Sequence, residues 1–165
     1  NYGMIECDLL PEISPRAVER FVELVRGQLT WTHPTLKKTF RKSIYTDTLF
    51  HRVAPGFMIQ GGDPVGTGFG GPGFALPDQF DCSLPFNEPG ILALANTGQP
   101  DSAGSQFFIT AAARPELSGR YTVLGRCNNL DVVQTIASVP RDESDRPLKD
   151  VLLREARVDA VTESR

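Results

Sequence analysis

Hydrophobic and polar residues alternate at the start of the chain. Ile5, Cys7 and Leu9 are apolar, and the residues between them are acidic. A period of two is typical of a β-strand with one buried face. The pattern predicts a first strand within residues 4–10.

Two segments have the spacing of an amphipathic helix. The first begins at Ser14 and Pro15, residue types favoured at an N-cap and in the first turn, and carries apolar residues at positions 18, 21, 22 and 25 before Gly27. The second covers residues 129–138 and is ended by Pro140. We therefore expect two helices.

The remaining apolar runs are short and are separated by clusters of glycine and proline. Such runs predict β-strands, and many short strands indicate a barrel or a sandwich. The predicted strands cover residues 50–53, 57–60, 91–95, 107–110 and 121–124, with a closing strand at 151–158.

Two polar segments interrupt this pattern. Residues 28–43 have no regular period and contain a basic cluster from Lys37 to Lys42, which predicts a loop or short hairpin with a solvated face. Residues 141–145 form a polar loop before the closing strand. No repeat or change of composition marks a boundary, so we expect one domain spanning residues 1–165.

Composition supports a globular, β-rich protein. Of the 165 residues, 40% are hydrophobic and 22% charged, so the chain can bury a core. Its 15 glycines and 13 prolines argue against an all-helical bundle. A net charge of -3 lacks the basic excess of nucleic-acid binding proteins, and no apolar stretch approaches a transmembrane helix in length. We expect neither a nucleic acid nor a membrane as partner.

The three cysteines, Cys7, Cys82 and Cys127, lie far apart and form no C-x-x-C motif. Their odd number and spacing favour free buried thiols over a disulfide framework or a zinc site. Free thiols favour a reducing cytoplasm. Because the sequence begins at Asn1, a periplasmic or secreted location after removal of a leader stays open.

Two familiar kinds of site are poorly supported. Gly66, Gly68 and Gly71 match the dinucleotide-binding pattern G-x-G-x-x-G, but no helical period follows them, so we interpret the segment as a turn-rich loop. The only histidines, His33 and His51, do not make a metal site with the scattered cysteines, and no nucleophile motif accompanies them. We expect no metal and no cofactor.

A segment of mixed character covers residues 50–63. His51 and Arg52 stand there among large apolar residues on predicted strands. A guanidinium stays charged, so Arg52 can donate a hydrogen bond to a neutral acceptor without acid-base chemistry. Most lone strand arginines are instead solvated or ion-paired.

Three long motifs follow one another along the chain: FHRVAPGFMIQGGDPVGTG, GILALANTGQPDSAGSQFFIT and LSGRYTVLGR. They resemble the successive signatures of cyclophilins, which are peptidyl-prolyl cis/trans isomerases. The resemblance covers essentially the whole chain, and the loop around Trp31 resembles bacterial members. It implies a mainly β fold, a closed eight-stranded antiparallel β-barrel capped by two α-helices, with the substrate groove on its outer wall.

The resemblance also implies the residues of the active site. Arg52 matches the catalytic arginine of the family. The proline pocket is formed by Phe57, Met58, Phe108 and Leu117. The polar positions that hold the peptide backbone and the arginine are Gln60, Asn96 and Gln106. The other substrate-binding positions are His51 at the rim, Ala95 in the neighbouring groove, and Tyr121.

These residues suit rotation about an X-Pro bond, which is slow because it breaks amide resonance. The proline nitrogen of the twisted transition state gains a lone pair that can accept a hydrogen bond from Arg52. The expected substrates are proline-containing segments of unfolded or flexible polypeptides, whose folding the enzyme assists as a monomer.

Three positions depart from the family pattern. Glu116 stands where many eukaryotic members have a tryptophan that contacts the drug cyclosporin, Tyr121 replaces a common histidine, and Thr97 replaces a common alanine. We expect isomerase activity with weak cyclosporin binding at most.

Two alternatives use the same features of the sequence. A non-catalytic proline-peptide binding or chaperone module would use the apolar pocket without stabilising a transition state. A nucleotide bound by residues 61–71 would raise the thermal stability of the protein. The presence of Arg52, Gln60 and Phe108 together favours the enzyme.

Overall fold

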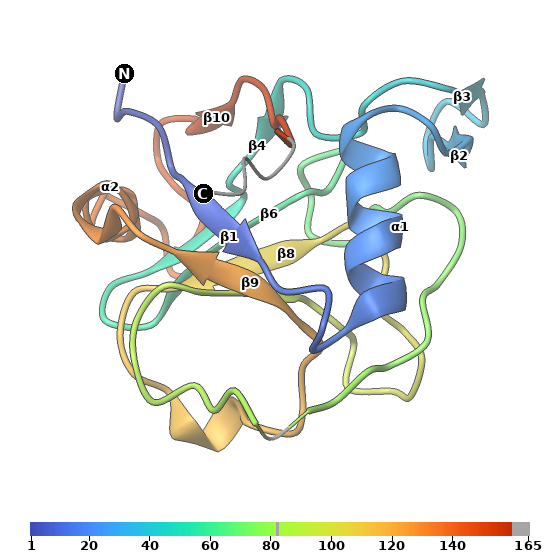
Figure 1. Cartoon of the computed structure of the whole chain (residues 1–165). Helices are drawn as coiled ribbons and strands as arrows, with labels where there is room; N and C mark the ends of the chain where they lie inside the picture. The colour runs from blue at the N-terminus through green and yellow to red at the C-terminus, as the bar shows by residue number, and fades with distance from the viewer. Residues whose placement is uncertain (82, 160–165) are drawn as a thin grey trace.

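The computed structural model describes residues 1–81 and 83–159, and it shows mainly antiparallel β-structure with two α-helices (Figure 1). Helix α1 (Pro15–Val25) and helix α2 (Leu130–Ala137) lie on opposite sides of the strands. Both lie where the apolar spacing predicts them. Within the described residues, neither helix is long and apolar enough to cross a bilayer.

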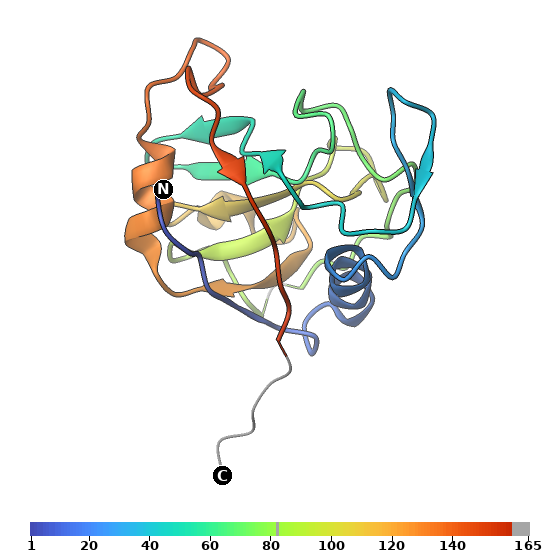
Figure 2. The same ribbon diagram turned by 90° about the horizontal axis from the view of Figure 1, so that it is seen from above.

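The main sheet has six strands in the order β1-β9-β7-β8-β6-β5, and every pairing in it is antiparallel. Two small sheets, β10-β4 and β2-β3, accompany it (Figure 2). The strands are β1 (Cys7–Leu9), β2 (Trp31–Thr32), β3 (Thr39–Phe40), β4 (Thr48–Leu49), β5 (Arg52–Ala54), β6 (Met58–Gly61), β7 (Ile91–Leu94), β8 (Phe107–Thr110), β9 (Val123–Cys127) and β10 (Leu152–Leu153), and a short 3-10 helix, η1 (Pro115–Leu117), precedes β9.

Most predicted strands are confirmed. Strands β1, β7 and β8 lie within the predicted runs, whereas β5, β6 and β9 overlap the predicted runs and end later. Residues 28–43 contain the hairpin β2-β3. The closing strand is shorter than predicted, because only Leu152 and Leu153 pair with another strand. The sequence does not predict their partner, β4, since two residues are too few to show a period.

The start of α1 is capped differently from the expectation. Ser14 is fully buried, and its hydroxyl donates to the backbone oxygen of Val123 on β9 instead of capping the first turn. The side-chain oxygen of Gln79 accepts a hydrogen bond from the backbone N–H of Ala17, at 2.7 Å. This bond satisfies one of the helix's free N–H groups, while Ser14 fastens α1 to the sheet.

The main apolar core lies between α1 and one face of the sheet. The ring of Phe21 on α1 lies 5.2 Å from that of Tyr45 and 6.2 Å from that of Phe107 on β8. Tyr45 is completely buried, which raises the pKa of its hydroxyl, and this hydroxyl donates to the backbone oxygen of Ser105 at 3.0 Å. Because side chains alternate along a strand, Phe108 faces the other side of the sheet.

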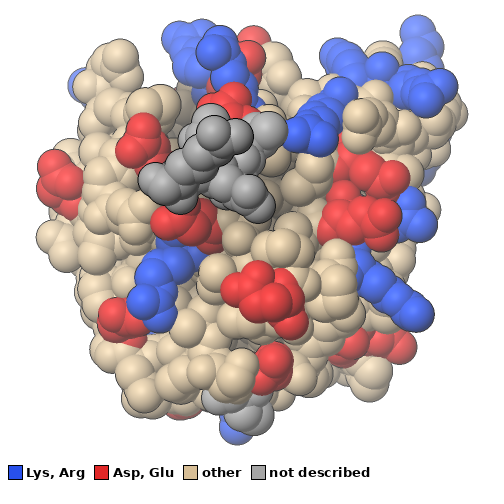
Figure 3. Space-filling model, viewed as in Figure 1, with Lys and Arg blue, Asp and Glu red and all other residues tan. Residues whose placement is uncertain are grey.

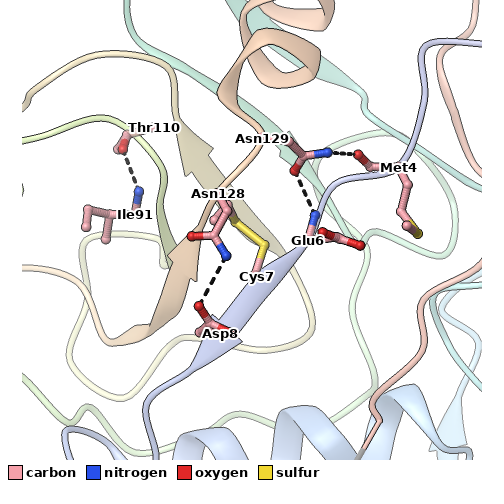
Figure 4. Close-up of a disulfide and its surroundings, with 9 residues drawn as sticks. Met4, Glu6, Cys7, Asp8, Ile91, Thr110, Asn128 and Asn129 are labelled. Carbon is pink, nitrogen blue, oxygen red and sulfur yellow. Dashed lines mark hydrogen bonds between the residues drawn. A yellow bond between two sulfur atoms is a disulfide. The ribbon is translucent and has the colours of Figure 1, made fainter. Parts of the chain in front are cut away.

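The prediction of free thiols is wrong for two of the three cysteines. Cys7 on β1 and Cys127 on β9 are opposite one another in the register and form a disulfide (Figure 4). Beside it, the amide of Asn128 donates to the carboxylate of Asp8 at 3.2 Å, so the end of β9 holds β1 by side-chain contacts as well. The disulfide joins residues 120 apart in sequence. A cross-link over so long a loop stabilises the folded state by about 5 kcal/mol in the chain-entropy account.

Spacing rules miss this pair because the antiparallel pairing of the first and ninth strands brings the two cysteines together. The premise that favoured a reducing compartment therefore does not hold for Cys7 and Cys127. The expectation for Cys82 lies outside the described residues.

Charges of both signs are mixed over the face shown in Figure 3. Lysine and arginine side chains gather at its upper right, over the hairpin β2-β3. The basic residues of this hairpin, Lys37, Lys38, Arg41 and Lys42, are all exposed. The prediction of a solvated basic face is confirmed.

Candidate active site

The sequence-predicted site residues meet at one groove of about 630 Å³. It lies on the face of the sheet opposite the main core, where a second apolar cluster contains Met58 and Phe108. All but one of the predicted residues line it; Gln106 instead supports the groove from behind. The predicted residues in the lining are His51, Arg52, Phe57, Met58, Gln60, Ala95, Asn96, Phe108, Leu117 and Tyr121.

Strand register brings the central residues together. Arg52 on β5 is opposite Gln60 on β6, and Gln60 is opposite Phe108 on β8. Residues opposite one another in adjacent strands project from the same face. The cation, the amide and the aromatic ring therefore form a row across three neighbouring strands.

The apolar wall of the groove is firmly packed. Met58 and Phe108 are only 2% and 4% exposed. The Phe108 ring meets the edge of Tyr121 at 5.1 Å between ring centres and stacks with Phe86 at 6.1 Å. Aromatic pairs in these geometries add to the stabilisation from burial. The wall is a preformed pocket for a small apolar ring.

Arg52 lies at the edge of this wall and has a charged partner. Its side chain is 43% exposed, and its Nη2 lies 3.3 Å from Oδ2 of Asp145. The guanidinium carbon lies 5.9 Å from the centre of the Phe57 ring, within the range of a cation–π contact. The guanidinium is thus held between a carboxylate and the pocket, with further N–H donors available to a ligand.

The side-chain amides of the site are engaged with the protein. Gln60 Nε2 donates to Oε1 of Gln106 at 2.9 Å, and Gln106 Nε2 donates to the backbone oxygens of Gly68 and Gly70, each at 2.9 Å. Asn96 Nδ2 donates to the backbone oxygen of Arg120 at 3.0 Å. Gln106 therefore acts as a bridge between Gln60 and the glycine-rich loop.

That loop is organised by one buried carboxylate. Asp63 is fully buried and accepts hydrogen bonds from the backbone N–H groups of Val65, Thr67, Gly68 and Gly70. Burial alone would raise the pKa of Asp63, but these four bonds outweigh it and hold the pKa below the usual 3.8. The interpretation of this glycine-rich segment as a turn-rich loop is confirmed.

Gly70 is required for this arrangement. A Cβ atom at that position would lie 1.9 Å from Oδ1 of Asp63, far inside contact distance. The backbone can approach the carboxylate only because glycine has no side chain.

His51 lies beneath the same loop and is 7% exposed. Neither ring nitrogen hydrogen-bonds to another of the described residues. Burial lowers its pKa below the usual 6.5; the Asp63 carboxylate opposes this shift and Arg146 adds to it. His51 is therefore neutral near pH 7 and packs under the rim of the groove.

Sequence reasoning missed the wall of the groove that faces the apolar pocket. Two loops form it, and their residues in the lining are Thr67, Gly68 and Phe69 of one loop and Asp142, Ser144 and Arg146 of the other. Polar composition predicts a loop at residues 141–145. No local pattern places it beside Arg52, which precedes Asp145 by 93 residues.

Metal ligands do not converge at the groove. Nowhere in residues 1–81 and 83–159 do three or more His, Cys, Asp or Glu side chains stand close enough to hold a metal ion. The groups that line the groove include the guanidinium groups of Arg52 and Arg146, the side-chain amides of Gln60 and Asn96, and an apolar pocket. Such a set can grip a peptide and donate hydrogen bonds to it.

Comparisons with known proteins show which family the chain is similar to. The family profile described as "Cyclophilin type peptidyl-prolyl cis-trans isomerase/CLD" matches residues 1–158. Peptidyl-prolyl cis-trans isomerase B of Streptomyces anulatus is 45% identical over 157 residues, which cover 93% of this chain and 89% of that protein. Peptidyl-prolyl cis-trans isomerase A of Mycobacterium tuberculosis is 40% identical over 156 residues, covering 93% of this chain and 85% of that protein.

A solved structure is similar over nearly the whole chain. It is a cyclophilin-type peptidyl-prolyl cis-trans isomerase of Cryptosporidium parvum, crystallised in the presence of the dipeptide Ala-Pro. The TM-score is 0.80 at 31% sequence identity, and the alignment covers 94% of this chain and 92% of that one.

Proposed function

Because the chain belongs to the cyclophilin-type peptidyl-prolyl cis-trans isomerases, and so catalyses rotation about X-Pro peptide bonds, we propose that Arg52 is its catalytic residue. The apolar pocket beside Arg52 holds the proline ring of the substrate. The observation that carries the proposal is the row of Arg52, Gln60 and Phe108 across β5, β6 and β8. It sets a hydrogen-bond donor next to a pocket of the right chemistry.

Arg52 stabilises the twisted state of the peptide bond. As the bond rotates, the proline nitrogen loses conjugation and gains a lone pair, which accepts a hydrogen bond from the guanidinium. This bond is weak or absent in both planar ground states, so it lowers the barrier instead of tightening substrate binding. Each factor of ten in rate requires about 1.4 kcal/mol of such differential stabilisation.

The other residues hold the parts of the substrate that must not move. Phe57, Met58, Phe108 and Leu117 enclose the pyrrolidine ring. The amides of Gln60 and Asn96, with Gln106 behind them, position the backbone of the substrate. One side of the bond then rotates against a partner that is held in place, in a partly desolvated groove where the hydrogen bond from Arg52 is stronger than in water.

The test is the cis-to-trans relaxation rate of an Ala-Pro peptide with Arg52→Ala. We expect the catalysed rate constant to fall about 100- to 1000-fold, the loss of one well-placed donor to a developing charge. The matched control is Arg126→Ala. Arg126 has the same 43% side-chain exposure and an ion pair with Glu88, but it lies on β9 outside the groove lining.

The proposal requires that the control retains the wild-type rate and that both variants melt cooperatively. A folded Arg52→Ala variant with the wild-type rate would remove the proposed role of Arg52, although the family's activity would stand.

We further propose that the strands close into one eight-stranded barrel and that the chain forms one domain. Support comes from a contact that joins β4 to the main sheet: Leu49 forms an isolated bridge with Asp63, next to β6. Strand β4 in turn holds β10, because the two strands pair and Phe50 donates its backbone N–H to the oxygen of Val151 at 2.9 Å. Slow hydrogen exchange at Phe50, lost together with that of β8 in one unfolding transition, is the expected result.

Family membership implies proline-containing polypeptides as substrates, and we propose that the protein acts on them as a monomer with weak cyclosporin binding. Glu116 on η1 is exposed and lies 3.6 Å from the guanidinium of Arg114. A charged pair at this rim disfavours the binding of a largely apolar drug, because binding would remove water from the two charges at a cost in free energy. Inhibition titration with cyclosporin checks this; tight inhibition contradicts it. A monomeric mass by light scattering checks the oligomeric state.

A further inference from the structure

We propose that Asp145 is a positioning residue for the isomerisation. Its carboxylate holds the Arg52 guanidinium against the groove, so that the free N–H groups of Arg52 stay directed at the bound X-Pro bond. This inference rests on the proposed catalytic role of Arg52. It adds a residue from a loop that none of the three sequence motifs contains.

The two carboxylate oxygens of Asp145 contact two different arginines. Oδ2 lies 3.3 Å from Nη2 of Arg52, and Oδ1 accepts a hydrogen bond from Nε of Arg141 at 3.0 Å. Arg141 therefore fixes the carboxylate from the side away from Arg52. A guanidinium has five N–H donors, so Arg52 keeps donors for the substrate after it has bound Asp145.

The backbone of Asp145 is fastened to the strand that carries Arg52. The N–H of Val53, the residue after Arg52, donates to the backbone oxygen of Asp145 at 2.8 Å. Within the loop, the N–H of Asp145 donates to the oxygen of Asp142 at 3.1 Å, and Arg141 forms a β-bridge with Pro147. Both ends of the Arg52 to Asp145 contact are therefore anchored to β5.

The loop is also fastened to the other loop of the same wall. Nη1 of Arg146 donates to the backbone oxygen of Gly66 at 2.6 Å, in the loop that Asp63 organises. Asp145 is thus part of a braced wall and not of a free surface loop.

Such a contact is expected to affect the rate more than the stability. Half-exposed ion pairs contribute little to the free energy of unfolding, because solvent screens them and both side chains lose freedom. A free arginine side chain, in contrast, samples many rotamers, few of which direct its donors at the substrate. Restricting Arg52 therefore increases the fraction of enzyme molecules that are ready for the reaction.

The backbone of Asp145 decides which variants test this. Its φ is +64°, in the left-handed region that asparagine and glycine adopt readily but alanine does not. Asp145→Asn keeps an oxygen acceptor and removes the charge, and Asp145→Gly removes the side chain without straining the loop. Glu143→Gln is the matched control, because Glu143 is an exposed carboxylate in the same loop, whereas the ion pair of Arg52 is formed by Asp145.

We expect Asp145→Gly to lower kcat about 5- to 10-fold with KM changed by less than about 2-fold, the signature of lost positioning. Asp145→Asn is expected to restore part of that loss, because its oxygen can still accept from Arg52. Glu143→Gln is expected to keep the wild-type kcat. All three variants are expected to keep the wild-type melting temperature within a few degrees.

A double-mutant comparison separates positioning from other effects. In the Arg52→Ala background, Asp145→Gly is expected to cause no further loss of rate, since there is no guanidinium left to position. An equal loss in both backgrounds overturns the inference, as does an unchanged or raised kcat in Asp145→Gly, or an equal loss in Glu143→Gln.

The outcomes also separate this inference from its premise. If Arg52→Ala loses the rate while Asp145→Gly keeps it, only the positioning role of Asp145 fails. If Arg52→Ala keeps the rate, the proposed role of Arg52 fails and that of Asp145 fails with it.

Discussion

The two walls of the groove are built in opposite ways. The apolar wall stands on paired strands, and its central residues, Met58 and Phe108, are nearly inaccessible to solvent. The facing wall consists of two loops, in which Phe69 is 98% exposed and Asp145 is half-buried. The first wall is held by strand pairing and packing, and the second by hydrogen bonds from side chains to backbone.

The difference in construction matches a difference in function between the two walls. A pocket that must recognise a rigid ring benefits from the dense packing of a core. A wall that fixes a guanidinium and borders a passing polypeptide can be built from polar contacts at the surface. Mutations in the first wall should therefore affect stability and activity together, whereas those in the second should separate them.

Phe108→Ala is expected to have the largest effect on stability among the variants that compare the walls. Loss of a buried phenylalanine leaves a cavity and costs about 3–5 kcal/mol of the free energy of unfolding. The same change empties the proline pocket and lowers the catalysed rate. Urea denaturation and the relaxation assay measure both. An unchanged free energy of unfolding would mean that the apolar wall is not part of the core.

Asp63→Asn tests the hydrogen bonds that organise the glycine-rich loop. At neutral pH we expect a loss of about 1–3 kcal/mol, because the amide cannot accept all four backbone N–H bonds. The pKa of Asp63 is lower in the folded state than its usual 3.8. Its ionised form therefore stabilises the fold fully above that pH, and the stabilisation is lost as the pH falls through the lower, folded-state value.

The difference in unfolding free energy between wild type and Asp63→Asn is thus expected to shrink below about pH 4. Urea unfolding at pH 7 and at acid pH measures it. Asp47→Asn, at an exposed carboxylate paired with Arg154, serves as the control. If the difference in unfolding free energy between wild type and Asp63→Asn did not change with pH, Asp63 would act by its shape and not by its charge.

Phe69→Ala is expected to have the smallest effect. It removes the same atoms as Phe108→Ala, but from a side chain that is already in solvent, so the free energy of unfolding should change by less than about 0.5 kcal/mol. The pair of phenylalanine variants thus compares the two walls with one chemical change. A large destabilisation by Phe69→Ala would show that the loop wall is packed like a core.

The candidate site shows where prediction from sequence succeeds. The strands that carry Arg52, Gln60 and Phe108 follow from local apolar patterns, and the long motifs point to the residues themselves. The hydrogen-bond partners of the side-chain amides of Gln60 and Gln106 were not predictable. Gln60 and Gln106 come together across β6 and β8 because of strand register, which no single segment specifies.

The sequence analysis missed the disulfide and the partner of Arg52 for the same reason. Cys7 and Cys127 are 120 residues apart, and Arg52 and Asp145 are 93 apart. Spacing rules are blind to such pairs, because the chain path between the partners decides whether they meet. The role of Ser14 was missed for the same reason, since its hydroxyl donates to the backbone oxygen of Val123, 109 residues away, instead of capping its own helix.

The amino-acid sequence by itself determined the two helices, the longer strands, the turn-rich glycine loop and the family, because each depends on residues that are neighbours along the chain. Only the tertiary structure decided the pairing of β4 with β10, the Cys7 to Cys127 bond and the loop wall that brings Asp145 to Arg52. These contacts exist because distant segments are packed against one sheet, and their energies depend on distances that no local pattern encodes.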